Sequence, residues 1–211
     1  MANDYITAAD MEAERPDTTW DSTYDTLMGL IATAASRYID SLCLKPASYF
    51  YADTAAARYF DGTSGTKLWV DHMAAAPSAV AVAEMGDVDG AAGTGGTYTT
   101  WATSDYYCWP MNAASIPEPY QALVIDAING SKNTWYTYPR CVKITAQWGG
   151  YTAVPSDIKR ITMAEAVRML KKAQQSYRDT GGIIELGKLT YTKAIDPMTA
   201  LVIAKYKTVS V

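Results

Sequence analysis

The chain has 211 residues, 49% of them hydrophobic and 19% charged, which is enough apolar material for a sizeable core and excludes an intrinsically disordered protein. The formal net charge of -4 argues against a protein built for sequence-specific DNA binding. No basic stretch followed by an apolar run opens the chain, and no run of about eighteen apolar residues occurs in it, so we expect no secretion and no membrane insertion.

Charge is unevenly distributed along the chain. Residues 1–154 carry 8 basic and 17 acidic side chains, whereas residues 155–211 carry 10 basic and 5 acidic ones. Such asymmetry is typical of a protein whose two ends meet different partners, and it is equally typical of a helix with a solvated basic face. The sequence leaves both interpretations open.

The first 46 residues predict two helices. The stretch Thr7-Ala8-Ala9-Asp10 has the form of an N-cap followed three residues later by an acid, and Pro16 ends the short helix that it opens. From about Asp21 to Leu44, apolar residues recur at steps of three and four, which indicates one face of a long α-helix. Pro46 prevents this helix from continuing.

Residues 47–154 predict a small antiparallel β unit. Short runs rich in Tyr, Trp, Val, Ile and Thr alternate with Gly, Pro, Asn and Asp, and turns are expected at Asp61-Gly62 and Asn129-Gly130. Five glycines between Gly86 and Gly96 predict a mobile loop, because little side-chain burial offsets the entropy of ordering it. The strands are expected near residues 48–60, 67–70, 78–84, 97–109, 121–128 and 139–148.

The remaining residues predict a second long helix followed by short elements. Ser156 can cap a helix that runs to about Arg178, and the glycines at 181 and 182 stop it. The segment from Ile183 to Tyr191 predicts one or two short strands. Asp196-Pro197 predicts the N-cap and first residue of a short helix that ends near Lys205.

The expected fold class is therefore α+β, with a helical-bundle core of two long helices and short terminal helices, and an inserted small antiparallel β unit. We treat residues 1–211 as a single domain with four parts. These are the N-terminal helices (residues 1–46), the β-rich insertion (47–154), the second long helix with short strands (155–196), and the C-terminal helix and tail (197–211).

The sequence contains no arrangement of residues typical of a catalytic, metal or cofactor site. The single histidine, His72, follows a predicted strand next to Asp71, and no nucleophile turn accompanies it. The run Asp87-Val88-Asp89-Gly90 lacks the later ligands of a calcium loop. Widely separated cysteines indicate free, mostly buried thiols rather than disulfides or zinc ligands. These cysteines are Cys43, Cys108 and Cys141.

Aromatic residues suggest a function in another class of protein. Tyr106, Tyr107 and Trp109 fall within a predicted strand, whose alternation turns Tyr107 and Trp109 to one face and Tyr106 with Cys108 to the other. At least one of these two faces belongs to the core or to a subunit interface. Aromatic rings on an exposed face can instead stack on sugars. These rings allow the hypothesis of a carbohydrate- or surface-binding β module. A glycoside hydrolase, which needs two opposed carboxylates in a cleft, is a further hypothesis.

Several segments, taken in order, resemble the head-tail connector proteins of tailed bacteriophages, also called adaptor or head-completion proteins. The resemblance extends over residues 4–178. The segments that carry it are Tyr5-Ile6-Thr7 with the acidic helix after it, Ala34-Ala35-Ser36-Arg37-Tyr38-Ile39-Asp40, Arg58-Tyr59-Phe60-Asp61-Gly62, Thr103-Ser104-Asp105-Tyr106-Tyr107-Cys108-Trp109-Pro110, and Val142-Lys143-Ile144-Thr145-Ala146-Gln147-Trp148-Gly149 leading into Val154-Pro155-Ser156-Asp157-Ile158-Lys159.

The resemblance implies a structural, non-enzymatic neck protein of the virion that assembles in the host cytoplasm. Helices would pack side by side around a channel with the β unit outside or at one end. The implied partners are copies of the chain in a dodecameric ring, the portal protein on one side, and a tail, tail-terminator or stopper protein on the other. Genomic double-stranded DNA would pass through the bore without sequence-specific binding, and no membrane is involved.

Two site hypotheses follow. The C-terminal tail alternates apolar and polar side chains, so it can add a strand to a neighbour's sheet edge, and the resemblance implies that it anchors the portal; a frayed terminus is the alternative. Its residues are Lys205, Tyr206, Lys207, Thr208, Val209, Ser210 and Val211. Acids of the first long helix would line the channel and repel the phosphate backbone, namely Asp21, Asp25 and Asp40.

Overall fold

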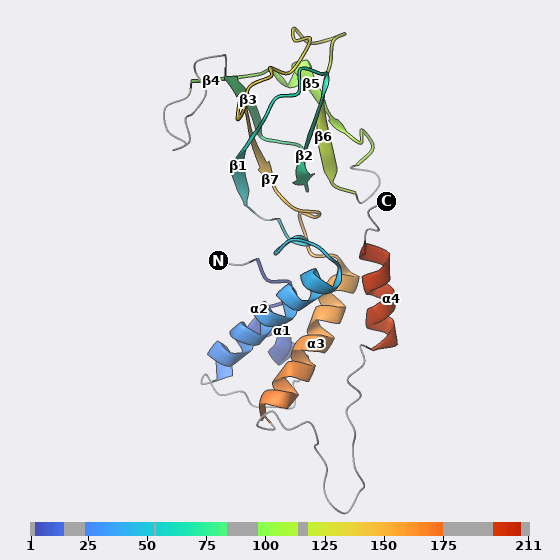
Figure 1. The fold of residues 1–211 in the computed structure, drawn as a ribbon. Coiled ribbons are helices and arrows are strands. Elements are labelled where there is room, and N and C mark those ends of the chain that lie inside the picture. Colours follow the sequence, from blue (N-terminus) through green and yellow to red (C-terminus); the bar gives the residue numbers. More distant parts are fainter. Residues whose placement is uncertain are drawn as a thin grey trace, which may run out of the picture. The chain divides into compact units, whose positions relative to one another are not determined.

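The computed structural model describes residues 3–14, 24–52, 54–83, 97–113, 118–174 and 196–207. The chain divides into two compact units. The helical unit consists of Met1–Phe50 and Val154–Val211, and the β unit consists of Tyr51–Ala153 (Figure 1). The β unit is therefore inserted between the two halves of the helical unit, and the predicted α+β class is confirmed.

Four helices occur in the described part of the helical unit. They are α1 (Ala8–Ala13), α2 (Asp25–Leu42), α3 (Ser156–Gln174) and α4 (Pro197–Tyr206). Helix α1 has the predicted capping box, in which the Thr7 hydroxyl accepts from the Asp10 N–H (3.1 Å) and the Asp10 carboxylate accepts from the Thr7 N–H (2.8 Å). Helix α4 begins as predicted, because the Asp196 carboxylate accepts from the N–H groups of Met198 and Thr199.

The core of the helical unit lies between α2 and α3. Met28, Ile31 and Ala35 of α2 form the buried stripe that the three-and-four spacing predicts. This stripe packs with Ala166 and Leu170 of α3. The N-terminal segment completes the cluster with Ile6 and Met11.

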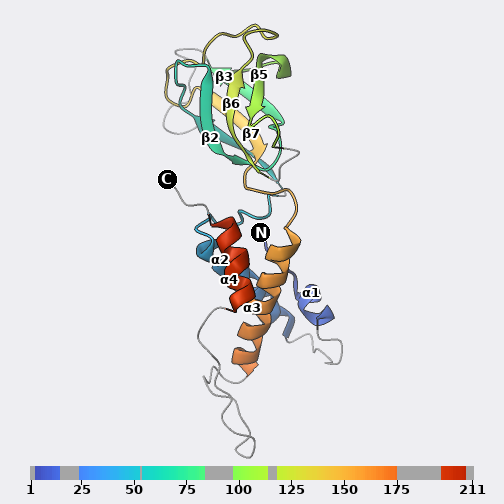
Figure 2. The same ribbon diagram turned by 90° about the vertical axis from the view of Figure 1, so that its right-hand side faces the viewer.

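The β unit contains two antiparallel sheets (Figures 1 and 2). Its strands are β1 (Ala55–Phe60), β2 (Lys67–Met73), β3 (Ala79–Ala83), β4 (Tyr98–Thr100), β5 (Tyr106–Trp109), β6 (Tyr120–Ile125) and β7 (Val142–Gln147). The strand order is β1-β7-β3-β4 in one sheet and β2-β6-β5 in the other. Leu68, Leu123, Val80 and Ile144 are among the residues that these sheets contribute to one shared cluster.

The β unit thus has a hydrophobic cluster separate from that of the helices. The predicted single helical-bundle core is corrected to two cores, one for each unit. The reason lies in the strands themselves. In β7, for example, fully buried side chains alternate with half-buried ones, so one face of the strand buries apolar surface within the β unit. The division of the chain falls after Phe50 and after Ala153.

Several local predictions need correction. Residues 47–50 form turns, with Ser48 at a positive φ of 64°, so β1 begins at Ala55 rather than near 48. The expected strand 97–109 is divided into β4, a 3-10 turn (Thr103–Asp105) and β5. Asp61-Gly62 is not a hairpin turn, because β1 pairs with β7 instead of β2. The Asn129-Gly130 turn is confirmed.

Three further expectations concern residues that the structure does not describe. These are the glycine-rich loop from Gly86 to Gly96, the end of the second long helix beyond Gln174, and the short strands from Ile183 to Tyr191. In the described part of the chain, no helix combines the length and the apolar character that crossing a lipid bilayer requires.

Candidate functional site

The C-terminal residues proposed to bind the portal begin inside a helix. Lys205 and Tyr206 form the last turn of α4, and Lys207 follows with extended backbone while its N–H still donates to Ile203 O (2.9 Å). Lys205 and Tyr206 are therefore helical, and the extended part of the tail begins at Lys207. Residues 208–211 lie outside the described part of the chain.

Asp157, in the first turn of α3, holds the end of α4. Lys205 Nζ donates to Asp157 Oδ2 (2.7 Å), and the Tyr206 hydroxyl donates to Asp157 Oδ1 (2.8 Å). Burial raises the pKa of the Asp157 carboxyl, but the hydrogen bonds from Lys205 and Tyr206 outweigh it, so this pKa lies below its usual value. Burial and then the bond to Asp157 raise the pKa of Tyr206 to about 12. The Tyr206 phenol therefore remains protonated and donates.

The Tyr206 ring also contacts the last residue of the helical unit before the β unit. Its ring packs edge-on against Phe50, with ring centroids 5.2 Å apart. Phe50 makes similar edge contacts with Tyr5 (5.7 Å) and Tyr49 (5.3 Å). Such aromatic pairs add about 0.5–1.5 kcal/mol beyond their burial. The C-terminal end of α4 is thus fixed next to the point where the chain leaves the helical unit.

The three acids proposed to line a channel have different surroundings. Asp21 lies outside the described residues, and Asp25 is exposed in the first turn of α2. Asp40 is only 2% exposed. A carboxylate so placed presents no surface to passing DNA, so the channel-lining hypothesis does not hold for Asp40.

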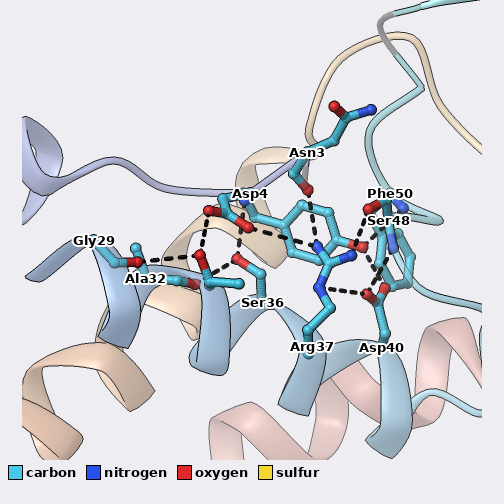
Figure 3. A network of polar contacts seen from close by, with 11 residues as sticks. Asn3, Asp4, Gly29, Ala32, Ser36, Arg37, Asp40, Ser48 and Phe50 are labelled. Atoms are coloured by element: carbon cyan, nitrogen blue, oxygen red, sulfur yellow. Dashed lines mark hydrogen bonds and ion pairs between the residues drawn. The ribbon is translucent and has the colours of Figure 1, made fainter. Parts of the chain in front are cut away.

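Asp40 instead belongs to a buried polar network (Figure 3). The Tyr5 hydroxyl donates to Asp40 Oδ1 and accepts from the Phe50 N–H (3.1 Å). Asp40 Oδ2 accepts from the Ser48 N–H (3.0 Å) and lies 3.5 Å from Arg37 Nε. Arg37 also donates to the Asn3 carbonyl (2.8 Å) and to the Ser48 hydroxyl. These contacts join the N-terminal segment, α2 and the turn at 47–50.

A second part of the network continues along α2 (Figure 3). The Thr33 hydroxyl donates to Asp4 (2.6 Å), and the Tyr5 N–H donates to the Ser36 hydroxyl (3.0 Å). Ser36 in turn donates to the Ala32 carbonyl (2.8 Å). Segments far apart in sequence thereby provide hydrogen-bond partners for each other's polar groups.

Burial dominates the ionisation of this network. It raises the pKa of Tyr5 above its ordinary value, and the neighbouring Asp40 carboxylate raises it further. Burial also raises the pKa of Asp40, although Tyr5, Ser48 and Arg37 favour the ionised carboxylate. The Asp40 carboxylate therefore links the N-terminal segment, α2 and the turn at 47–50.

The outer face of the sheet β2-β6-β5 carries a cluster of tryptophans around a lysine. Trp69 on β2 and Trp109 on β5 are both in register with Ala122 of the central strand. Both indoles are exposed, and they pack edge-on over this small residue with centroids 5.6 Å apart. The Lys67 ammonium lies 3.9 Å from the Trp69 ring centroid and 3.6 Å from that of Trp109.

Alternation in β5 is as predicted. Tyr106 is buried in the cluster of the β unit and Cys108 packs against it, whereas Trp109 is exposed. One face of the strand is thus core. The three cysteines are free thiols, of which Cys43 and Cys141 are buried.

Cation-π contacts are general in the β unit. Each of its basic side chains lies over a Tyr or Trp ring, with separations between 3.6 and 5.8 Å, and these side chains are Arg58, Lys67, Lys132, Arg140 and Lys143. These cation-π contacts were not predicted from the sequence. For Lys67 they could have been, because residues two apart in a strand share a face and Trp69 is two residues from Lys67.

His72 and its neighbour Asp71 form no catalytic pair. His72 lies within β2 rather than beyond a strand, and the Asp71 carboxylate pairs with Arg58 (2.5 Å). In the part of the chain that is described, no three His, Cys, Asp or Glu residues are grouped so that they could hold a metal ion.

An open groove of about 610 Å³ lies between α1 and α3. Met163 and Val167 are among its apolar lining residues, and its acids are Asp10 and Glu14. Burial raises the pKa of Asp10, but the hydrogen bonds from Lys159 and Thr7 lower it by more. The pKa of Asp10 therefore lies below its usual value. Asp10 is therefore unsuited to the general-acid role of a glycoside hydrolase.

No protein-family model matches the sequence, and no curated protein matches it. Solved structures share the fold over its whole length. A chain in the neck of an empty GTA particle, computed with C6 symmetry, is similar with a TM-score of 0.58 at 14% identity. A chain in the neck of a native GTA particle, computed with C12 symmetry, has a TM-score of 0.53 at 16% identity.

A third similar chain comes from the virion of a native gene transfer agent (GTA) particle, with a TM-score of 0.52 at 16% identity. In all three comparisons the similarity covers 100% of this chain and 97% of the other. The chain thus has the fold of chains found in necks and virions of gene transfer agent particles.

Proposed function

We propose that this chain is a structural neck protein of a tailed phage or a related particle, a ring-forming adaptor that joins the portal vertex of the capsid to the tail or to a stopper protein. The observation that carries the proposal is the structural similarity, over 100% of this chain, to chains from the necks of GTA particles. A dodecameric ring agrees with the C12 symmetry applied to one of them. The proposed location is the neck of the virion, after assembly in the host cytoplasm.

The C-terminal residues are the proposed portal anchor. In support, Asp157 and Phe50 fix the end of α4, so the chain leaves this helix at a defined place in the helical unit. Residues 207–211 then bind a neighbouring surface, and Lys205 and Tyr206 set the point from which they start. A strand added to a sheet edge of the portal remains the proposed mode of contact.

The channel is proposed to carry double-stranded DNA without sequence-specific binding. Asp21 and Asp25 remain the proposed lining acids, because carboxylates repel the phosphate backbone during its passage. Asp25 supports this role by being exposed in the first turn of α2.

The proposal is tested with the portal protein of the same particle. The full chain is mixed with assembled portal, sedimented, and imaged by electron microscopy; a twelvefold ring bound to portal is expected. Deletion of residues 208–211 should abolish co-sedimentation without changing the helical content. Portal that sediments without the full chain contradicts the adaptor role, and unchanged binding of the deletion variant contradicts the anchor.

The exposed Trp69 and Trp109 favour a second candidate function, a carbohydrate- or surface-binding β module of a tail or baseplate. The rings meet at 80°, so they form a corner rather than a flat platform for a sugar. Glycan-array binding that is lost in Trp69→Ala would favour this function, and an array without signal would remove it.

A further inference from the structure

Helix α4 leaves an apolar surface uncovered in the single chain. Only Thr199 and Ile203 of this helix are buried. Met198 and Leu201 are 63% and 67% exposed, and their spacing of three residues places them on one side of the helix. We call Met198 and Leu201 the α4 outer face. Single exposed apolar residues are ordinary, but two large ones together on a short helix mark a contact surface.

Helix α2 has a similar uncovered stripe. Leu30 is 65% exposed and Tyr38 is 38% exposed, and Ala34 between them is exposed as well. A spacing of four residues places all three on one side of the helix, which differs from the side that buries Met28 and Ile31. We call Leu30, Ala34 and Tyr38 the α2 outer face. No charged side chain occurs among these three.

The two outer faces belong to two different helices of the helical unit. Helix α3 contacts both α2 and α4. In Figure 1, α3 lies between α2 and α4, and in Figure 2, turned by 90°, α4 lies in front of α2. The two apolar faces therefore belong to helices on either side of α3.

Identical copies in a closed ring meet through two different surfaces, because each copy uses one face toward the neighbour on one side and another toward the neighbour on the other. A single self-complementary face would give only a dimer. The helical unit has two distinct apolar faces, one on α2 and one on α4, as a ring requires. The α2 outer face spans about two helical turns and the α4 outer face just under one, so the α4 outer face can cover part of the α2 outer face.

We infer that the α4 outer face of one copy packs against the α2 outer face of the next copy, and that this contact closes the ring; the inference rests on the proposed neck function. Leu201 and Met198 of one copy contact Leu30, Ala34 and Tyr38 of its neighbour. Removal of these side chains from water drives the association. The tail that follows α4 is then held at the junction between two copies.

Charge substitutions on the two faces test the inference. In Leu30→Asp the α2 outer face is blocked, and in Leu201→Asp the α4 outer face is blocked. Each variant alone should be a monomer in sedimentation velocity, whereas the wild-type chain forms rings. Ile128→Asp is the matched control, because Ile128 is 92% exposed and belongs to the β unit. It should form rings as the wild type does.

A mixture of the two variants gives the sharpest test. Leu30→Asp retains an intact α4 outer face and Leu201→Asp retains an intact α2 outer face, so an equimolar mixture should form dimers and no larger species. Circular dichroism checks that both variants are folded. A mixture that stays monomeric, a single variant that dimerises by itself, or rings from either variant overturns the inference.

Failure of this contact is distinguishable from failure of the neck role. A wild-type chain that remains monomeric at about 1 mM overturns the inference, because the faces then lack measurable affinity. Co-sedimentation of that same chain with portal would still support the neck role. Loss of portal binding with rings intact would overturn the neck role and leave the contact between copies standing.

Discussion

The hydroxyl of Tyr206 and the carboxylate of Asp157 are 2.8 Å apart, although 49 residues separate them in sequence. This bond and the one from Lys205 hold the end of α4 against the beginning of α3. One carboxylate therefore provides two of the contacts that position α4, in addition to the packing of Tyr206 against Phe50. The side chain of Asp157 is largely shielded, whereas that of Lys205 is mostly exposed, so Tyr206 contributes the more durable contact.

Asp157→Ala should loosen α4 while the β unit stays intact. Loss of the acceptor frees Tyr206 and Lys205, so amide exchange in α4 should accelerate about tenfold. Hydrogen exchange followed by mass spectrometry measures this. Asp71→Ala removes an exposed ion pair within the β unit and is the matched control, for which α4 exchange should not change. Equal exchange in both variants would contradict the assigned role of Asp157.

Acid should release α4 in the wild-type chain. The pKa of Asp157 is lowered in the folded chain, so its stabilising effect is complete above the ordinary value of about 4 and is lost as the pH falls through the folded value. The NMR signals of Ile203 should therefore shift as the pH falls below about 4. In Asp157→Ala the same signals should lack this transition, and a transition of equal size there would refute the assignment.

Tyr5→Phe should destabilise the helical unit. The substitution leaves the Phe50 N–H and the buried Asp40 carboxylate without their shared partner. An unsatisfied buried group costs about 1–3 kcal/mol in the free energy of unfolding, which urea denaturation measures. Tyr107→Phe, on the outer face of β5, is the control and should change stability by less than about 0.5 kcal/mol. Comparable losses in both variants would speak against the network.

Two glycine substitutions should have opposite signs. A Cβ at Gly62 would lie 1.4 Å from the Tyr136 carbonyl oxygen, so Gly62→Ala should destabilise the β unit by several degrees in Tm. A Cβ at Gly29, within α2, meets nothing within 4 Å, so Gly29→Ala should stabilise by about 0.5–1 kcal/mol through helix propensity. Thermal denaturation measures both, and a stabilised Gly62→Ala would disprove the close approach.

The thiols should be unreactive in the folded chain. Burial raises the pKa values of Cys43 and Cys108 to about 11, and burial also raises the pKa of Cys141. At pH 8 a thiol with a pKa of about 11 is ionised to about one part in a thousand, and the thiolate is the reactive form. Iodoacetamide labelling at pH 8 should be slow until denaturant is added. Rapid labelling of the native chain would contradict this burial.

Much of the secondary structure could be predicted because its causes are local. The Thr7 and Asp10 capping box, the Asp196 cap of α4 and the buried stripe of α2 depend on residues three or four positions apart. The inward turn of Tyr106 follows from alternation within a single strand. The α+β class followed from these short-range patterns.

Tertiary structure alone decided which distant segments meet. The sequence placed Asp40 in an amphipathic helix, but its burial depends on Tyr5 and Ser48, whose positions no helical pattern specifies. The pairing of β1 with β7, across more than 80 residues, and the Asp157 bond to Tyr206 are of the same kind. The spacing of apolar residues and the capping residues determine a residue's local conformation and the face on which it lies. Which buried polar group or which strand lies next to it depends on the packing of the whole chain.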